Sequence, residues 1–172
     1  MSKKILIVLG HPDYSHSNAN KALIQLLDES ANVTVHNISE AYPGGKIDVQ
    51  KEQALLESYD RIIFQFPTYW FNVPGSFKVW IDQVLTYGWA YGPGATALAG
   101  KEYGVATTTG SPLEVYQPDA VGFTIDAVIL PVVASLKYCG STYLGHAVLH
   151  NAMAVTPESV AEAKDSYLKL FA

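Results

Sequence analysis

The 172-residue sequence has few charged residues and almost no cysteine. Only 16% of its residues are charged, the formal net charge is −5, and no run of Lys or Arg is longer than Lys3-Lys4. The basic footprint of a nucleic-acid-binding protein is therefore absent. The single cysteine, Cys139, cannot form an internal disulfide, which is compatible with a reducing compartment.

Long apolar runs are also missing. The run at residues 5–9 is too short for the apolar part of a signal peptide, and His11-Pro12-Asp13 interrupts it. No stretch approaches the ~20 apolar residues that a membrane-spanning helix needs. We therefore expect a soluble, cytoplasmic protein.

Several motifs of known chemistry are absent. The sequence has no Gly-x-Gly-x-x-Gly of dinucleotide sites, no Gly-Lys-Ser/Thr of triphosphate sites and no Gly-x-Ser-x-Gly of hydrolases. His146 and His150 would lie ~13 Å apart on an extended strand, too far to share a metal ion. On a helix they could meet, but no carboxylate accompanies them, so we expect no metal site. Cys139, beside Gly140 in an apolar stretch, is predicted to be a buried structural thiol.

Apolar residues make up 49% of the sequence, enough for a substantial core. A chain of this length buries roughly 70% of the surface that it exposes when unfolded. No internal repeat, low-complexity tract or linker divides the sequence. We expect one domain that spans residues 1–172.

Short apolar runs alternate with longer amphipathic patterns along the chain. Strands are predicted at residues 5–9, 33–38, 61–66 and 103–108 and within 144–154. Helices are predicted at 17–30, 48–59 and 74–87, within 124–140, and from Thr156 onward. Pro131 either begins or kinks the fourth of these helices, and the sequence leaves both readings open.

This alternation predicts a three-layer α/β fold, with a five-stranded parallel sheet and helices on both faces, because neighbouring parallel strands need crossover connections. Ligands of such sheets bind beyond the carboxyl ends of the strands. The loops after the first, third and fourth strands are therefore the places where a functional site is expected.

The first of these loops, residues 10–20, is rich in small polar side chains. Ser15, Ser17, Asn18 and Asn20 surround a predicted helix start, where free N–H groups favour an anion. Their hydroxyls and amides could complete a phosphate cradle. The alternative is that Ser and Asn only cap the helix.

The second loop, residues 66–74, contains three consecutive aromatic residues, Tyr69, Trp70 and Phe71. Exposing so much apolar area on a loop is unfavourable without a ligand or a partner. The rings therefore indicate a platform for a flat ligand, or else a cover for the edge of the core or a subunit interface.

The third loop follows the fourth strand and contains Thr107, Thr108, Thr109, Gly110 and Ser111. Its N–H groups and hydroxyls could stabilise negative charge on a heteroaromatic ring. Alone it is a weak signal, since Thr and Gly are common at strand ends. Together, a phosphate cradle, an aromatic platform and a donor-rich edge predict a site for flavin mononucleotide (FMN).

The same segments resemble the NAD(P)H:quinone oxidoreductases of the flavodoxin-like fold. The resemblance is carried by Gly10-His11-Pro12, Ser17-Asn18-Ala19-Asn20-Lys21, Phe66-Pro67, Trp70, Pro74, Lys78, Trp80-Ile81-Asp82, Gly88-Trp89-Ala90-Tyr91-Gly92, Thr108-Thr109-Gly110 and Tyr138-Cys139-Gly140. Within the family the chain is most similar to short bacterial members, which include the ancillary oxidoreductase of glutathione-gated potassium efflux systems.

The resemblance implies a homodimer with one flavin per subunit at the interface, and it assigns residues to that flavin. The ribityl-phosphate loop would comprise His11, Ser17, Asn18, Ala19 and Asn20. The flavin ring would be lined by Thr68, Tyr69, Trp70 and Phe71, and its pyrimidine edge by Thr108, Thr109, Gly110 and Ser111.

The resemblance also implies a proton relay. Tyr116 lies where larger members have a tyrosine that relays protons to the reduced flavin. Those members have a histidine a few residues further on, but residues 117–122 here contain none. This departure puts the relay in question.

The expected function is that of a flavoprotein oxidoreductase, an NAD(P)H dehydrogenase (quinone). NADH or NADPH would pass a hydride to the flavin, and a quinone or similar flat acceptor would then take it in a ping-pong, two-electron reaction. FMN is favoured over FAD because the chain is short, and NADH and NADPH are not distinguished. The alternatives are a regulatory subunit in peripheral contact with a membrane transporter, and a flavodoxin-type carrier of single electrons.

Overall fold

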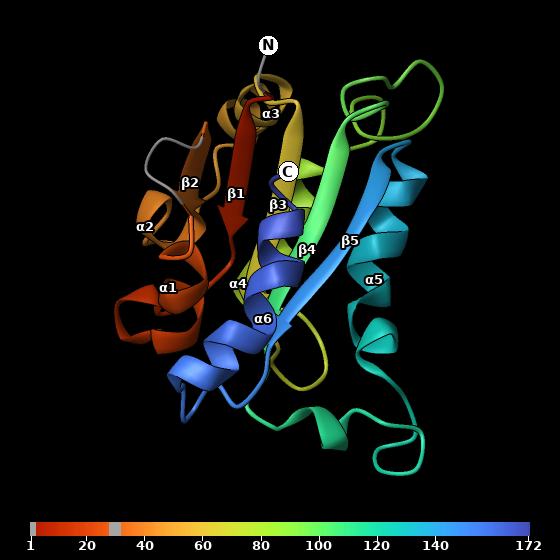
Figure 1. Ribbon diagram of the computed structural model, residues 1–172. Coiled ribbons are helices and arrows are strands. Elements are labelled where there is room, and N and C mark those ends of the chain that lie inside the picture. Colours follow the sequence, from red (N-terminus) through yellow and green to blue (C-terminus); the bar gives the residue numbers. More distant parts are fainter. Residues whose placement is uncertain (1–2, 28–31) are drawn as a thin grey trace.

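The computed structural model describes residues 3–27 and 32–172. Within these ranges, five parallel strands form one sheet in the order β2-β1-β3-β4-β5 (Figure 1). The strands are β1 (Ile5–Leu9), β2 (Val33–Asn37), β3 (Arg61–Pro67), β4 (Glu102–Thr108) and β5 (Thr142–Leu149). All five agree with the predicted strands to within a few residues.

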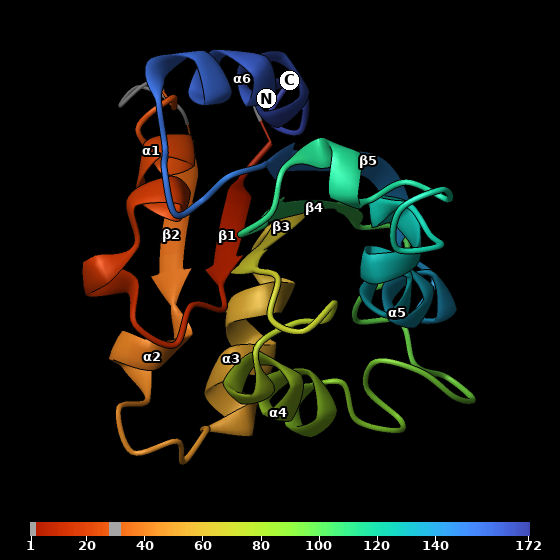
Figure 2. The same cartoon turned by 90° about the horizontal axis from the view of Figure 1, so that it is seen from below.

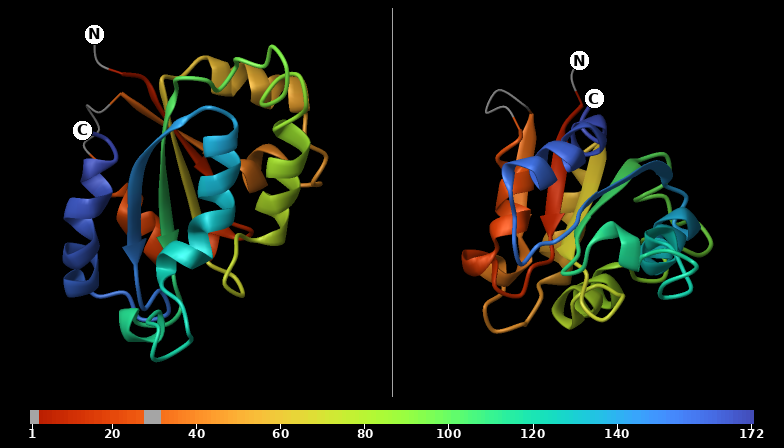
Figure 3. Two further views of the ribbon diagram at one scale, coloured as in Figure 1. Left: turned by 90° about the vertical axis from the view of Figure 1, so that its right-hand side faces the viewer. Right: turned by 60° about the horizontal axis from the view of Figure 1, so that its bottom comes forward.

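Helices cover both faces of this sheet, which confirms the three-layer prediction (Figures 2 and 3). Helices α1 and α6 pack on one face, and α3, α4 and α5 pack on the other. The helices are α1 (Asn18–Ile24), α2 (Ile38–Ala41), α3 (Val49–Glu57), α4 (Gly75–Val84), α5 (Ile125–Tyr138) and α6 (Pro157–Lys169). Two 3₁₀ turns, η1 (Tyr14–His16) and η2 (Leu113–Val115), lie in the loops. The longest helix of the described residues, α5, has 14 residues, so none of these helices could cross a membrane.

The predicted helix at 17–30 extends too far. Helix α1 ends at Ile24, and the chain continues with tight turns in which the N–H groups of Leu26 and Leu27 donate to carbonyls three residues back. These two leucines pack on the core and so continue the apolar spacing without being helical. Residues 28–30 lie outside the described part of the chain.

The structure also determines the places of Ile38 and Pro131. Ile38 was predicted as the end of a strand, but it begins α2, because the side chain of Asn37 accepts a hydrogen bond from Ser39 N and caps the helix. Pro131 lies inside α5 and does not begin it, which decides between the two open readings.

The side chains of β1 divide between the two faces of the sheet. Ile5, Ile7 and Leu9 pack towards α1 and α6, and Leu6 and Val8 pack towards α3 and α4. This alternation follows from the twofold period of a strand. Burial on both faces explains why β1 is a continuous apolar run.

The end of β1 passes very close to α4. A Cβ atom at Gly10 would lie 2.3 Å from Cγ of the fully buried Phe77. Only glycine fits this position, and the close approach fixes where the first loop leaves the sheet.

A buried carboxylate connects α3 with α4 and β2. Glu52 is fully buried and accepts hydrogen bonds from Trp80 Nε1 (2.8 Å), Tyr42 OH (2.7 Å) and His36 Nε2 (2.9 Å). Burial disfavours ionisation, but the three hydrogen bonds together bring the pKa of Glu52 below its ordinary value. The charged form is therefore part of the folded structure.

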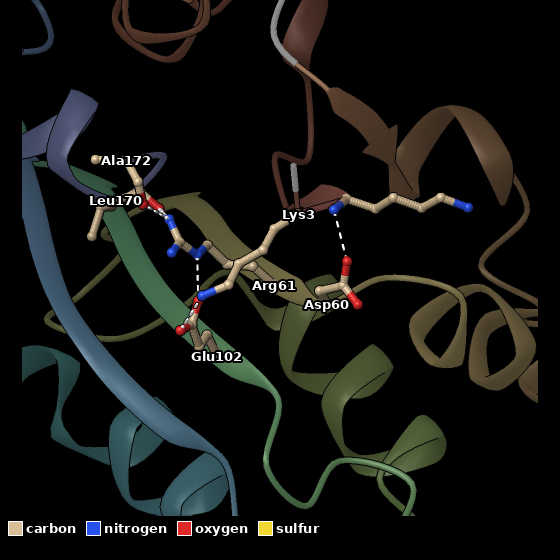
Figure 4. Close-up of polar contacts among 7 residues, drawn as sticks. Lys3, Asp60, Arg61, Glu102, Leu170 and Ala172 are labelled. Carbon is tan, nitrogen blue, oxygen red and sulfur yellow. Dashed lines mark hydrogen bonds and ion pairs between the residues drawn. The ribbon is translucent and has the colours of Figure 1, made fainter. Parts of the chain in front are cut away.

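The amino edge of the sheet is closed by a second polar cluster (Figure 4). Arg61 is buried, and its Nε lies 2.8 Å from Glu102 Oε2. The Arg61 Nη1 atom donates to the Leu170 carbonyl (2.8 Å) and to the oxygen of Ala172 (2.7 Å). Lys3 completes the cluster at 2.5 Å from Glu102 Oε1. These contacts hold the segment after α6 against β3 and leave the opposite edge to the loops.

Replacement of Glu52 by Gln should destabilise the fold by about 3 kcal/mol at pH 7, because an amide cannot satisfy three donors as a carboxylate does. Since the folded-state pKa is lowered, the carboxylate stabilises the fold above the pKa of an unfolded glutamate, about 4.3. This contribution is lost as the pH falls through the folded-state value. In urea unfolding, the midpoint of Glu52→Gln should lie well below that of the wild type at pH 7, and the difference between the two midpoints should become smaller at pH 3. The exposed Glu40→Gln serves as the control, and equal midpoints at pH 7 would contradict the prediction.

Candidate functional site

The carboxyl ends of the strands lie together at one edge of the sheet, at the bottom of Figure 1. In the register of the sheet, Leu9 is the partner of Gln65, Pro67 of Thr108, and Thr108 of Leu149. The loops after β1, β3 and β4 therefore start from one edge, as predicted. The chain leaving β5 joins them there.

A buried hydrogen-bond network ties the first loop to this edge. Asn20 is fully buried, and its Nδ2 donates to Ser17 Oγ (3.3 Å) and Thr108 Oγ1 (3.2 Å). Gln65 Nε2 donates to Asn20 Oδ1 at 3.2 Å and to the Asn20 carbonyl at 3.1 Å. Tyr167 of α6 donates to Gln65 Oε1 at 2.8 Å. The side chains of Asn20, Gln65 and Thr108 are therefore hydrogen-bonded to one another and hold the loop in position.

The start of α1 is capped as the alternative reading expected. Ser17 Oγ accepts from the N–H of Asn20, and the Ser17 and Ala19 side chains are buried. Ser15 and Asn18 are exposed. Lys21, for which the sequence predicted no separate role, donates from its Nζ to the carbonyl of Ser15 and brings a cation to this loop.

His11 lies buried at the base of the same loop. Its Nδ1 accepts a hydrogen bond from the N–H of Asp13 at 3.1 Å, so the neutral ring carries its proton on Nε2. Burial lowers the pKa of His11, Lys21 lowers it further, and Asp13 opposes both. A neutral His11 is thus a hydrogen-bond donor through Nε2.

A cavity of about 530 Å³ opens beside this loop, between α2 and α4. Its walls include Pro12, Tyr42 and Val79, and Ser39 and Ser76 supply hydroxyls. Ser39 Oγ also donates to the His11 carbonyl at 2.5 Å. The volume lies in the range of small-molecule sites.

The second loop is a tight, strained turn. Tyr69 and Asn72 exchange backbone hydrogen bonds of 2.8 and 3.1 Å, and Trp70 and Phe71 between them have φ values of 49° and 60°. Left-handed backbone at two bulky residues costs free energy and is typical of functional sites. Trp70 at the tip is 94% exposed, and Tyr69 is 47% exposed.

The ring of Phe71 points back to the protein. It lies 5.3 Å from the ring of Phe123 and 6.2 Å from that of Tyr116, edge to face in both cases. Phe71 therefore covers a neighbouring loop, as the alternative reading of the aromatic residues allowed. Phe71 is still 41% exposed, so all three rings keep some surface open to a flat ligand, and Trp70 keeps the most.

The third loop uses most of its hydroxyls internally. Thr107, Thr108 and Thr109 are buried, and Thr107 donates to the Phe66 carbonyl. Thr68, which starts the second loop, donates through its N–H to the carbonyl of Thr108. Gly110 and Ser111 are more exposed, and no described residue accepts a hydrogen bond from their N–H groups. Those two N–H groups are the donors that this edge offers to a ligand.

Tyr116 is buried beside this edge, with Phe71 on one side and His150 on another. The His150 ring lies 5.8 Å from the Tyr116 ring. In the sequence, His150 stands out only as a candidate metal ligand together with His146. Its position just after a strand end, at the same edge as the other loops, was the signal that could have identified it.

The remaining candidates lie apart from this edge. Cys139 is buried, and burial raises the pKa of its thiol, as predicted for a structural cysteine. His146 faces Asp126 at 3.6 Å. Across residues 3–27 and 32–172, no three His, Cys, Asp or Glu side chains lie close enough together to hold a metal ion.

Similar proteins share this architecture along nearly the whole chain. Residues 3–171 match the family model of the flavodoxin-like fold. The NAD(P)H oxidoreductase YdeQ of Bacillus subtilis is 38% identical over 96% of this chain and 85% of its own length. The glutathione-regulated potassium-efflux system ancillary protein KefG of Escherichia coli is 34% identical over 95% of this chain and 90% of its own length.

Two solved structures superpose closely. The general stress protein 14 of Treponema denticola, in complex with FMN, has a TM-score of 0.85 and 37% identity, covering 97% of this chain and 95% of that one. An NADPH-quinone reductase of P. pentosaceus has a TM-score of 0.86 and 30% identity, covering 100% and 98%. The chain therefore belongs to the flavodoxin-like NAD(P)H oxidoreductase family.

Proposed function

We propose that the protein is an FMN-dependent NAD(P)H:quinone oxidoreductase of the cytoplasm. The observation that carries the proposal is the meeting of an exposed aromatic turn at Tyr69 and Trp70 with the free N–H groups of Gly110 and Ser111 at one edge of the sheet. The names of YdeQ and the P. pentosaceus reductase support the activity, and the FMN complex of general stress protein 14 supports the cofactor. The lone free Cys139 suits a reducing compartment.

The residues at this edge fit a phosphate-tailed flat ring. Residues 11–20 would hold the ribityl phosphate through the His11 donor, the exposed Ser15 and Asn18, and the backbone that Ser17, Ala19 and Asn20 position. Thr68, Tyr69, Trp70 and Phe71 would line the ring. Thr108 and Thr109 would support its pyrimidine edge, and Gly110 and Ser111 would donate to it.

The bound flavin would supply the hydride-accepting chemistry, and the protein would supply orientation and charge stabilisation. The N–H groups of Gly110 and Ser111 would stabilise the negative charge that a hydride brings to the site. We assign Tyr116 to the proton relay, on the basis of its place at this edge beside Phe71. NADH or NADPH and a flat quinone would occupy the face beside Trp70 in turn.

A homodimer fits the distribution of exposed apolar side chains. Val79 of α4, Tyr87 of the loop after it, and Leu130 and Tyr138 of α5 are all exposed. The rings of Tyr87 and Tyr138 both lie against Tyr91, and α4 and α5 lie on one face of the sheet, so these exposed side chains favour a partner surface there. Analytical ultracentrifugation should return the mass of two chains for the wild type and of one chain for Tyr138→Asp. A wild-type protein that sediments as a single chain would overturn the dimer.

A second role is favoured by the likeness to KefG, whose name gives it as ancillary to a potassium-efflux system. Under this hypothesis the flavoprotein would also contact a membrane transporter from its cytoplasmic side. Co-purification with a membrane fraction from its own cell would test the contact. A chain found only in the soluble fraction would argue against it.

The purified chain should bind one FMN per subunit and then oxidise NADH or NADPH with a quinone as acceptor. Absorbance spectra and mass analysis of the released cofactor identify what is bound. FAD is tested beside FMN, because the cavity beside Pro12 offers space next to the first loop for a cofactor larger than FMN. Full reduction in a two-electron step during anaerobic titration distinguishes the reductase from a single-electron carrier. A protein that takes up neither FMN nor FAD would refute the proposed function.

Trp70→Ala should raise the Kd for FMN about 2- to 12-fold, because one aromatic contact is worth about 0.5–1.5 kcal/mol. The fold should be unaffected, since Trp70 is 94% exposed. Trp70→Phe keeps a ring and is the matched control. Flavin fluorescence titration gives the Kd, and thermal unfolding followed by circular dichroism checks the fold. If the wild type and Trp70→Ala bind FMN with equal affinity, the flavin ring does not lie against Trp70.

A further inference from the structure

A half-buried histidine at the ligand edge has no part in the function proposed above. His150 directly follows β5, and its ring lies 5.8 Å from the Tyr116 ring at an interplanar angle of 37°. Its Nδ1 lies 2.8 Å from Thr109 Oγ1. The backbone on either side is held too, because Thr109 N donates to the Leu149 carbonyl and Ala152 N donates to the Thr109 carbonyl. His150 is therefore a fixed element of this edge.

The hydrogen bonds of Thr109 determine which nitrogen of His150 carries the proton. The Thr109 hydroxyl has one proton, and it donates this proton to the Ser111 carbonyl at 2.8 Å. A carbonyl oxygen can only accept, so Thr109 Oγ1 is left to accept from His150 Nδ1. In the neutral ring, Nδ1 is thus protonated and Nε2 carries the free lone pair.

The surroundings of His150 act on its pKa in opposite directions, and burial has the largest effect. Burial lowers its pKa below the ordinary value, while the Ser111 carbonyl and the carboxylates of Glu114 and Glu162 act in the opposite direction. Glu114 belongs to η2 and Glu162 to α6, and the Tyr116 ring packs beside the imidazole. A negative charge brought into the site would raise the pKa of His150 and favour uptake of a proton.

We propose that His150 is the acid–base residue of this site and that its Nε2 holds the proton that completes reduction of the acceptor. The proposal rests on the proposed function. Imidazole is the side chain whose ordinary pKa lies closest to neutrality, so it both binds and releases a proton under working conditions. The His150 ring packs beside the Tyr116 ring, at the edge where the proposed acceptor would lie.

The proton balance of the reaction shows at which step His150 would act. Reduction of a quinone to its hydroquinone consumes one hydride, which NAD(P)H supplies, and one proton. The hydride brings a negative charge to the site, and His150 binds a proton from solvent at Nε2. That proton passes to a quinone oxygen, and the products are NAD(P)⁺, hydroquinone and the neutral imidazole.

His150→Asn separates the acid–base role from a structural one. The Asn amide can still donate to Thr109 Oγ1 in place of Nδ1, but it has no base in place of Nε2. The matched control is His146→Asn, four residues away on β5, where the ring faces Asp126 and Tyr143 and not Tyr116. If His150→Asn does not fold, His150→Gln replaces it, since it too lacks the base.

The first measurement needs no cofactor. Nitrogen NMR of the imidazoles in the wild-type chain should show His150 as the Nδ1–H tautomer, with a titration midpoint below the ordinary 6.5 for histidine. The resonance is assigned by its loss in His150→Asn. A His150 that carries its proton on Nε2 would overturn the proposal.

The second measurement uses the FMN-loaded enzyme. His150→Asn should bind FMN like the wild type but lower kcat for quinone reduction on the order of 100-fold. Only the imidazolium can donate the proton to the quinone, so wild-type kcat should fall as the pH rises through the pKa of His150. The pH profile of His150→Asn should not show this fall. His146→Asn should keep the wild-type profile.

The outcomes distinguish the two proposals. A wild-type enzyme without flavin uptake or quinone turnover refutes the proposed function, and the role of His150 fails with it. An active wild type with an equally active His150→Asn of unchanged pH profile refutes only the role of His150.

Discussion

The geometry of the ligand edge depends on the buried amide of Asn20. This one side chain joins the start of α1 to the end of β4 through Thr108, and its carbonyl oxygen receives Gln65 of β3. Tyr167 extends the chain of hydrogen bonds to α6, so the sheet and the helical layer formed by α1 and α6 meet at this network. A buried amide without hydrogen-bond partners is costly. The side chains of Asn20, Gln65, Thr108 and Tyr167 therefore favour the arrangement in which they bind one another. The first and third loops consequently keep a fixed separation before any ligand arrives.

The two edges of the sheet show how polar groups can serve opposite purposes. At the amino edge, Arg61, Glu102 and Lys3 neutralise one another and bind the segment after α6. At the carboxyl edge, buried threonines and Asn20 form the support, while the N–H groups of Gly110 and Ser111 stay open to a ligand. The strained turn that exposes Trp70 lies at the same edge. Free donors, exposed rings and backbone strain thus coincide at the carboxyl edge, which is the combination expected of a binding site.

The sequence predicted the strands well because burial on both faces leaves a clear signal, as in Ile5–Leu9. It overextended the first helix because Leu26 and Leu27 keep helical spacing while forming tight turns. The three loops were located correctly, since parallel strands must end at one edge. Which side chains are free within them was not predictable, because Phe71 turns towards Phe123 and Asn20 towards Thr108 only through contacts distant in sequence. The strained φ values of Trp70 and Phe71 likewise leave no mark in composition.

The place of Tyr116 shows that a residue distant in sequence can lie beside a tyrosine whose neighbours along the chain include no histidine. A histidine missing from residues 117–122 suggested a broken relay, yet the sheet brings the end of β5 beside the same tyrosine. Chemistry requires an imidazole within reach and in a defined tautomer, and it does not require a given spacing in sequence. Here the tautomer follows from Thr109, whose single proton is taken by the Ser111 carbonyl. Under the proposed function the third loop would therefore have two roles, since its backbone N–H groups would donate to the ligand and Thr109 would orient His150 beside them.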